Sequence, residues 1–324
     1  MSTWTPGTYA GNVHEVGFYQ SDEEFQAMIV PFVDEGVANG EPVVIGYDEP
    51  KSALLRLWLD DPSKVNFITD TSLYATPARA IATYRGLFKR HVAAGAPQVR
   101  IAGQVPHPGN GGSFAGWDRY EFAVNSVWDE FPVRSLCLYD ATTVPDPVRQ
   151  VVERMHPCTV TAAGAHQTNG RYDCDARNAR VPVSPDPLEA CPPNVELVDP
   201  STAEARHALE RLGRGLVDDR KLDDLLFGIS EAVTNARLHG VPPATVRIWA
   251  TAERLVADVS DRGRGPTDPL AGLVPMANAN LGTGLGLWIA HMLDIGALLV
   301  PTEDGFSFRL CAGRDRTPRG QEGT

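Results

Sequence analysis

The residues with the clearest chemical potential lie in the segment Glu231 to Gly240 of the C-terminal half. Glu231 and Asn235 are spaced i, i+4 in a segment whose pattern predicts a helix. Both side chains therefore project from one face, about 6 Å apart along the axis. A carboxylate can orient a water or hydroxyl, and a nearby amide oxygen suits Mg²⁺, which keeps waters and phosphates among its ligands. Taken alone, such a polar stripe is more often the solvated face of a half-exposed helix.

A second group begins with Asp261, which directly follows the predicted strand Leu255 to Ser260 and precedes Gly263 and Gly265. A carboxylate at a strand end can accept a hydrogen bond from an exocyclic amine, while the glycines let the backbone approach a ligand closely. A simple glycine turn is the alternative for this motif in isolation.

The third group is a glycine-rich loop that opens a predicted helix from about Gly284 to Leu293. Backbone N–H groups at a helix start bind anions, and glycines allow close approach to phosphates. Its glycines are spaced by two and two, unlike the dinucleotide-binding pattern GxGxxG. The loop residues expected to contact a ligand are Gly282, Thr283, Gly284, Leu285 and Gly286.

In this order, the three motifs resemble the ATP-binding domain of the superfamily of gyrases, histidine kinases and MutL proteins. The resemblance implies ATP and Mg²⁺ as cofactors. Glu231 would be the general base, Asn235 would bind Mg²⁺ and Asp261 would bind the adenine amino group. Gly263 and Gly265 would form the first glycine box, and the later glycine loop would hold the phosphates. The segment from Pro266 to Asn280 would form a lid.

Within that superfamily, the closest resemblance is to the anti-sigma-factor serine kinases, through the compact helix order and the sequence from Glu231 to Ala236. It implies a serine/threonine protein kinase that acts on an anti-sigma-factor antagonist, binds a sigma factor and forms a homodimer. His207 precedes Glu231 by only 24 residues and is followed by Ala208 and Leu209, so it does not resemble a phosphoacceptor histidine. Because the lid has no arginine near the expected γ-phosphate, a non-catalytic ATP-dependent binding module is an alternative. An orphan histidine kinase is another.

Strands alternating with helices in the N-terminal half predict an α/β domain with a mostly parallel sheet. This half resembles the MEDS sensory domain, which is similar to the RecA-type ATPase core and occurs with sensor kinases and transcription regulators. The resemblance rests on His14 to Tyr19, Gly36 to Gly40, Val99 to Ile101 with Gly103, Tyr120-Glu121, and Cys137 to Asp140 with His156-Pro157.

The RecA comparison predicts a phosphate loop at Gly46 to Ser52. That segment is one residue shorter than GxxxxGK[ST] and has Pro50 in place of the second glycine. Proline lacks the N–H that would face a phosphate, and Asp48 and Glu49 would repel one. We interpret the segment as a degenerate site that no longer hydrolyses nucleotide.

A sensory pocket for an unidentified small molecule is predicted where the parallel strands end, since open α/β sheets bind ligands there. The alternatives are an Arg100–Glu121 ion pair and a histidine satisfied at the sheet edge. The candidate lining residues are His14, Arg100, Glu121 and Asp140.

Length and composition favour two domains, because 324 residues exceed the usual size of one. We expect a MEDS-like domain at 12–157, a Pro/Gly-rich linker at 158–193, an ATPase domain at 194–312 and a disordered tail at 313–324. The ATPase domain is expected to be an α+β two-layer sandwich with helices on one face of a mixed sheet. Cys158, Cys174 and Cys191 lie in the linker, and their spacing matches no common metal-ligand pattern.

The net charge of −12 disfavours direct DNA binding, since a chain this acidic repels a phosphate backbone. A phosphate would therefore be bound by backbone N–H groups and Mg²⁺ rather than by a basic patch. The first residues lack the basic and apolar pattern of a secretory signal, so we expect none, and no apolar run approaches the roughly 20 residues of a membrane span. The odd number of cysteines, five, favours reduced thiols and a cytoplasmic protein.

Overall fold

The computed structural model describes residues 11–69, 71–173, 183–275 and 285–313. The chain divides into two compact units, Met1–Pro182 and Val183–Thr324. No helix in these described ranges is long and apolar enough to cross a membrane.

The first unit is built on a seven-stranded sheet with the strand order β3-β2-β4-β5-β1-β6-β7. All neighbouring strands are parallel except β6 and β7, so the predicted mostly parallel α/β fold is confirmed. The strands are β1 (Asn12–Tyr19), β2 (Val43–Gly46), β3 (Val65–Phe67), β4 (Val99–Gly103), β5 (Val133–Asp140), β6 (Cys158–Val160) and β7 (His166–Thr168).

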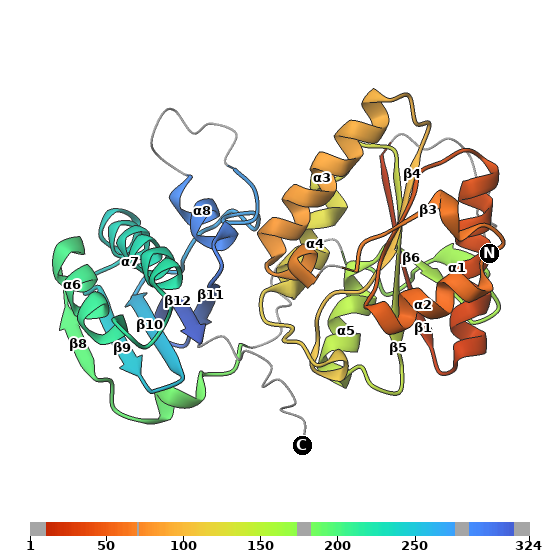
Figure 1. Cartoon of the computed structure of the whole chain (residues 1–324). Coiled ribbons are helices and arrows are strands. Elements are labelled where there is room, and N and C mark those ends of the chain that lie inside the picture. Colours follow the sequence, from red (N-terminus) through yellow and green to blue (C-terminus); the bar gives the residue numbers. More distant parts are fainter. Residues whose placement is uncertain (1–10, 70, 174–182, 276–284, 314–324) are drawn as a thin grey trace, which may run out of the picture. The chain divides into compact units, whose positions relative to one another are not determined.

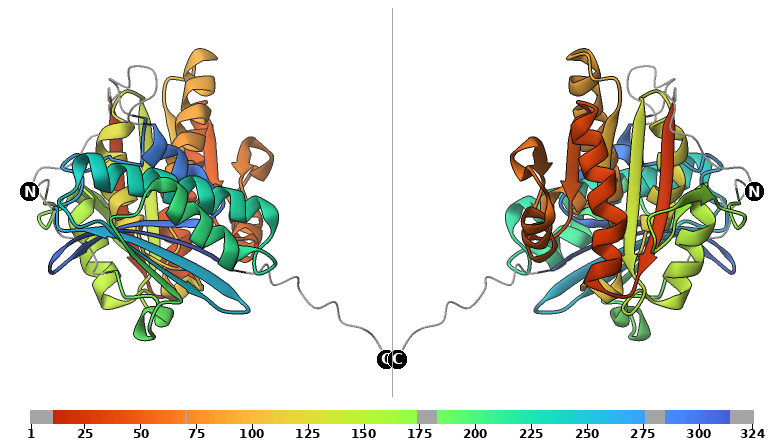
Figure 2. Two further views of the ribbon diagram at one scale, coloured as in Figure 1. Left: turned by 90° about the vertical axis from the view of Figure 1, so that its left-hand side faces the viewer. Right: turned by 90° about the vertical axis from the view of Figure 1, so that its right-hand side faces the viewer.

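Helices cover both faces of this sheet (Figure 1). Helices α1 and α2 pack on one face, and α3, α4 and α5 lie on the other (Figures 1 and 2). The helices are α1 (Asp22–Ala38), α2 (Glu49–Trp58), α3 (Pro77–Ala93), α4 (Trp117–Val127) and α5 (Asp146–Met155), with short 3-10 turns at Pro62–Lys64, Thr71–Tyr74 and Pro108–Asn110. The central strands β2 and β4 are therefore buried along their whole length, whereas the edge strands β3 and β7 are partly exposed.

Helix α1 shows how the sequence produces this layer. The Ser21 hydroxyl accepts a hydrogen bond from the Glu24 N–H at 3.3 Å and caps the helix. Glu24 in turn accepts from the Gln20 N–H at 2.7 Å rather than from that of Ser21. The helix then buries its apolar stripe against β1, β2 and β4, through Phe25, Met28, Ile29, Phe32 and Val33.

The Pro/Gly-rich composition of 158–193 predicted a linker, but part of this interval forms strands. Its first part forms β6, which pairs with β1 in parallel, and β7, which pairs with β6 antiparallel. Each strand has only three residues, so neither produces a detectable sequence alternation. The pairing depends on the exposed edge of β1, a tertiary feature.

The second unit is the predicted α+β two-layer sandwich. Its five strands follow the order β11-β12-β10-β9-β8, and every pairing described is antiparallel rather than mixed. The elements are β8 (Val195–Val198), α6 (Thr202–Gly213), α7 (Asp219–His239), β9 (Thr245–Ala250), β10 (Arg254–Asp261), α8 (Gly286–Met292), β11 (Gly296–Thr302) and β12 (Gly305–Gly313). The helices bury their apolar sides on one face of the sheet and form a single core with it.

The opposite face of this sheet is partly covered by the segment that precedes β8. Arg309 binds the Ser184 carbonyl at 3.0 Å and the Glu189 carboxylate at 2.6 Å. The Trp249 indole N–H donates to the Cys191 carbonyl at 2.8 Å. The C-terminal part of the predicted linker is thus packed onto the second unit.

Candidate functional site

Helix α7 carries the first motif of the second unit. The Asp218 carboxylate caps its start by accepting from the Lys221 N–H at 2.9 Å. Buried residues such as Leu225, Ile229 and Val233 pack on the sheet. Glu231 and Asn235 lie near the other end of the helix and are partly buried, so both remain within reach of a ligand.

The end of α7 and the end of β10 are joined through the carboxylate of Asp261. Asp261 Oδ1 accepts hydrogen bonds from the Val241 N–H at 3.0 Å and the Gly263 N–H at 2.6 Å. The Arg262 N–H donates to the Val241 carbonyl at 2.9 Å. These bonds occupy Oδ1 and leave Oδ2 as the carboxylate oxygen that could accept from a ligand.

The two glycines after Asp261 stand where side chains would not fit. A Cβ at Gly263 would lie 2.6 Å from Asp261 Oδ1. Gly265 has a φ of +71° and lies against the Phe306 ring, 2.2 Å from where its Cβ would be. The backbone conformation and the close packing both favour glycine at this position.

The second glycine box begins outside the described residues, since Gly282, Thr283 and Gly284 belong to 276–284. Leu285 and Gly286 are described, and Gly286 starts α8. A Cβ at Gly286 would lie only 1.7 Å from Glu231 Oε2. The start of α8 therefore packs directly on the Glu231 side chain, which brings the described end of the third motif to the first motif.

The segment after the first glycine box returns to α8. Gly272 has a φ of +78°, and its Cβ would lie 2.7 Å from the His291 ring. Arg262 and Arg264 are exposed. The described part of the expected lid, 266–275, contains no arginine or lysine, and its remainder lies outside the described residues.

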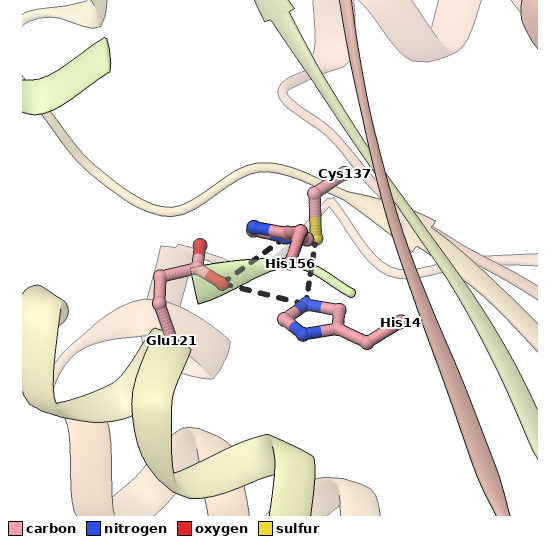
Figure 3. Close-up of side chains that lie close together, drawn as sticks. All are labelled: His14, Glu121, Cys137 and His156. Atoms are coloured by element: carbon pink, nitrogen blue, oxygen red, sulfur yellow. Dashed lines mark hydrogen bonds and ion pairs between the residues drawn. The ribbon is translucent and has the colours of Figure 1, made fainter. Parts of the chain in front are cut away.

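Two of the four predicted sensory residues of the first unit meet in its interior. His14 Nε2, from β1, lies 3.4 Å from Glu121 Oε2, from α4. Cys137 of β5 and His156, which follows α5, join them (Figure 3). Cys137 Sγ is 3.5 Å from His14 Nε2, and His156 Nε2 is 3.5 Å from Glu121 Oε2. His14 is the third residue of β1, so this cluster lies within the sheet layer rather than at the carboxyl ends of the strands.

The environment shifts the ionisation of the cluster. Burial, reinforced by His14, lowers the pKa of His156 to about 3. Burial acts to raise the pKa of Glu121, but His156, His14 and the Tyr139 hydroxyl outweigh it and keep that pKa below its usual value. Burial and the Glu121 carboxylate raise the pKa of the Cys137 thiol. Glu121 is therefore an anion beside a neutral His156 at neutral pH.

Arg100 and Asp140 do not join this cluster. The Arg100 guanidinium lies on the α1 side of the sheet, where it binds the Glu35 carboxylate and the Phe32 carbonyl, each at 2.8 Å, and also Glu41. Its predicted ion pair with Glu121 is therefore wrong. Asp140 does end its strand, but its carboxylate accepts from the Thr142 N–H at 2.8 Å and hydroxyl at 2.6 Å, as in a local turn.

The degenerate phosphate loop has a carboxylate where a phosphate would lie. Asp48 Oδ1 accepts from the Lys51 N–H at 3.0 Å at the start of α2. The Ser52 hydroxyl is buried and donates to the Tyr47 carbonyl at 3.2 Å. The helix start is thus already capped by an anion, which is consistent with the interpretation of this segment as a degenerate phosphate loop.

Sequence reasoning missed Cys137 and His156 as members of a site, although both belong to motifs of the MEDS resemblance. No short-range spacing links them to His14 and Glu121, since the four residues come from four separate segments. Only the observation that a cysteine, two histidines and a glutamate fall in apolar surroundings could have indicated them.

Models of two known protein families match the two units of the chain. Residues 13–157 match the model described as MEDS, "MEthanogen/methylotroph, DcmR Sensory domain". Residues 197–294 match the model of the histidine kinase-like ATPase domain. A search of curated proteins finds no match to the chain. The chain therefore carries a MEDS domain at its N-terminus and a histidine-kinase-like ATPase domain at its C-terminus.

Proposed function

We propose that the chain is an ATP-binding signalling regulator, in which the MEDS domain senses a signal and the ATPase domain uses ATP with Mg²⁺ to phosphorylate a partner protein on serine or threonine. The observation that carries the proposal is the meeting of three motifs in the second unit. Glu231 contacts the start of α8, and Asp261 is fixed against the end of α7. If these motifs lay apart in the structure, Glu231 would be part of an ordinary polar helix face and Asp261 part of an ordinary turn.

Each residue then has a role in a transfer reaction. Asp261 Oδ2 accepts from the adenine amino group, and Gly263 and Gly265 let the backbone approach the base. Asn235 would hold Mg²⁺, which would neutralise charge on the phosphates during transfer. Backbone N–H groups of the loop from Gly282 to Gly286 would bind the phosphates. Glu231 takes the proton of the attacking hydroxyl, so the γ-phosphoryl group passes from ATP to that oxygen and ADP leaves.

The anti-sigma branch is favoured over an autophosphorylating histidine kinase. His207 is exposed on α6, a helix of 12 residues that packs on α7 and β9 as part of the ATPase domain itself. The expected partners are a sigma factor and an anti-sigma-factor antagonist. A homodimer of the ATPase domain is part of the same proposal.

The test is transfer of labelled γ-phosphate from ATP to candidate antagonist proteins, with the product treated with acid. Acid-stable label on the partner, lost with Glu231→Gln, supports serine or threonine transfer. Acid-labile label on the chain itself or on a separate partner would overturn it in favour of a histidine kinase.

A second candidate function is a nucleotide-dependent binding module without phosphotransfer. It is favoured by the absence of basic residues from 266–275, since no arginine from this described stretch can approach a γ-phosphate. In this case ATP would strengthen binding of a sigma factor, and Glu231→Gln would leave that effect intact. Loss of signalling in this variant, with ATP and partner affinity unchanged, would argue against the binding module.

A further inference from the structure

The buried cluster of the first unit, His14, Glu121, Cys137 and His156, has the composition of a metal site. Its four ligand atoms are two imidazole nitrogens, one carboxylate oxygen and one sulfur, and all lie within 4.8 Å of one another. His14 is 1% exposed, and Glu121 and His156 are 0% exposed. The four side chains point toward a common centre from four separate segments (Figure 3).

The outer atoms of both histidines are already committed to hydrogen bonds. His156 Nδ1 lies 2.8 Å from the Val152 carbonyl, which can only accept, so Nδ1 carries the proton. His14 Nδ1 lies 3.0 Å from Asn125 Oδ1. The Asn125 amide cannot be turned round, because its Nδ2 donates to the carbonyls of Glu121 at 3.2 Å and Met155 at 2.7 Å. His14 Nδ1 is therefore a donor as well.

With Nδ1 of each ring directed outward, Nε2 of each ring faces the centre, where Glu121 Oε2 is a third atom able to bind a cation. The other oxygen, Glu121 Oε1, accepts from the Tyr139 hydroxyl at 2.6 Å. Within the described chain, Glu121 Oε2 and His156 Nε2 have no hydrogen-bond partner. Buried acceptors without donors are costly, and a cation resolves all of them at once.

The distances fit a four-coordinate ion. Bonds of about 2.0–2.3 Å to nitrogen, oxygen and sulfur give tetrahedral edges of about 3.3–3.8 Å. Three of the six separations between the ligand atoms are 3.4, 3.5 and 3.5 Å, within that range, and the other three are at most 4.8 Å, so a bound ion would draw the four atoms slightly closer together. A carboxylate and a thiolate would also balance a divalent charge, so the loaded site would be neutral. Nitrogen and sulfur donors exclude Mg²⁺ and Ca²⁺, which select oxygen.

We propose that His14 Nε2, Glu121 Oε2, Cys137 Sγ and His156 Nε2 bind one divalent transition-metal ion of the zinc class. The ion ties β1, α4, β5 and the segment after α5 together. Cys137 is only partly buried. With His14 it lines a cavity that has room for about one water-sized molecule, bordered by Tyr74, Tyr84, Tyr120 and Trp128. The cavity could hold a water molecule beside Cys137.

The test is titration of the full-length chain, first stripped with a chelator, with Co²⁺ and then with Zn²⁺. One equivalent of Co²⁺ should produce the visible bands of a tetrahedral site and one thiolate-to-cobalt charge-transfer band, and Zn²⁺ should displace it. Cys137→Ser should abolish the charge-transfer band, and Glu121→Gln and His156→Gln should weaken Zn²⁺ binding by at least about 100-fold. The matched controls Cys158→Ser and His91→Gln should leave both measurements unchanged.

The absence of a saturable Co²⁺ spectrum in the wild-type chain would overturn the proposal. So would a charge-transfer band that survives Cys137→Ser or disappears equally in Cys158→Ser. X-ray absorption of the wild-type Zn²⁺ form decides the question even if a variant does not fold. One sulfur at about 2.3 Å with three nitrogen or oxygen neighbours at about 2.0–2.1 Å is the expected shell, and a shell without sulfur or with several would contradict it.

Discussion

Replacing Asp261 with asparagine removes one acceptor from the proposed adenine site without removing the contacts that hold the loop. Asp261 Oδ1 accepts from the N–H groups of Val241 and Gly263 at 3.0 and 2.6 Å. The amide oxygen of the Asp261→Asn variant can accept the same two bonds. Its NH₂ group must then stand where Oδ2 was, so that a donor faces the adenine amino group.

The expected loss of ATP affinity follows from that exchange. A hydrogen bond to a charged group contributes about 1.5–3 kcal/mol, and leaving two donors opposed forfeits all of it. Since each 1.4 kcal/mol is a factor of ten, the dissociation constant for ATP should rise about 10- to 150-fold. Inosine triphosphate carries a carbonyl oxygen in place of the amino group. Inosine triphosphate should bind the variant better than it binds the wild-type chain, whereas ATP should bind the variant less well.

The assay is calorimetric titration of both nucleotides, with Mg²⁺, into the wild-type chain, Asp261→Asn and a control. Asp258→Asn is the matched control, because Asp258 is on the same strand but turned to the other face of the sheet, where it binds Ser307. Its ATP affinity should not change. An Asp261→Asn variant that keeps its thermal midpoint and still binds ATP with wild-type affinity would refute the assignment of Asp261 to adenine.

Three further perturbations test other parts of the structure. Gly286→Ala would put a Cβ 1.7 Å from Glu231 Oε2 and displace that carboxylate. The rate of ATP turnover should therefore fall about 100-fold, with a nearly unchanged thermal midpoint. An unchanged rate of phosphate release in a single turnover would contradict the role of Glu231. Arg100→Met removes the ion-pair partner of the largely buried Glu41, whereas the more exposed Glu35 keeps Arg134. The free energy of unfolding of the first unit should fall by about 2–3 kcal/mol in urea titrations, and a loss below about 1 kcal/mol would mean that the ion pairs are not structural. Burial, aided by Lys51, lowers the pKa of His107 from 6.5 to about 4, and its neutral Nδ1 accepts from the Gly109 N–H at 3.1 Å. The stabilisation that comes from neutral His107 is therefore complete above pH 6.5 and is lost as pH falls through about 4, by at most about 3 kcal/mol. The His107→Asn variant keeps a hydrogen-bond acceptor at this place but does not titrate. Its free energy of unfolding should therefore change less than that of the wild-type chain between those pH values.

Local patterns predicted the parts of the fold that depend on local physics. The pattern from Glu231 to Gly240 indicated the last part of α7, and the apolar run Leu255 to Ser260 indicated β10. The motifs of the second unit were also visible, because each lies at a fixed place in a helix, strand end or helix start. What the sequence did not reveal is that Gly286 abuts Glu231, a contact made by residues 55 positions apart.

Tertiary arrangement decided the features that sequence reasoning missed. No sequence pattern in β4 indicates the partners of Arg100, which come from α1 (Glu35) and from the segment between α1 and β2 (Glu41). The strands β6 and β7 are too short to be recognised without the edge of β1 beside them. His14 and Glu121 were paired in one site, but Cys137 and His156 join them through the topology of the sheet rather than through any spacing.

The most direct test of the proposed ATP site is a structure of the full-length chain with Mg²⁺ and a non-hydrolysable ATP analogue. The base should lie against Gly263 with its amino group hydrogen-bonded to Asp261 Oδ2. Asn235 should coordinate Mg²⁺, and Glu231 should face the γ-phosphate. A nucleotide bound at the Gly46 to Ser52 loop of the first unit, or bound in the second unit without Asp261 and Asn235, would contradict it.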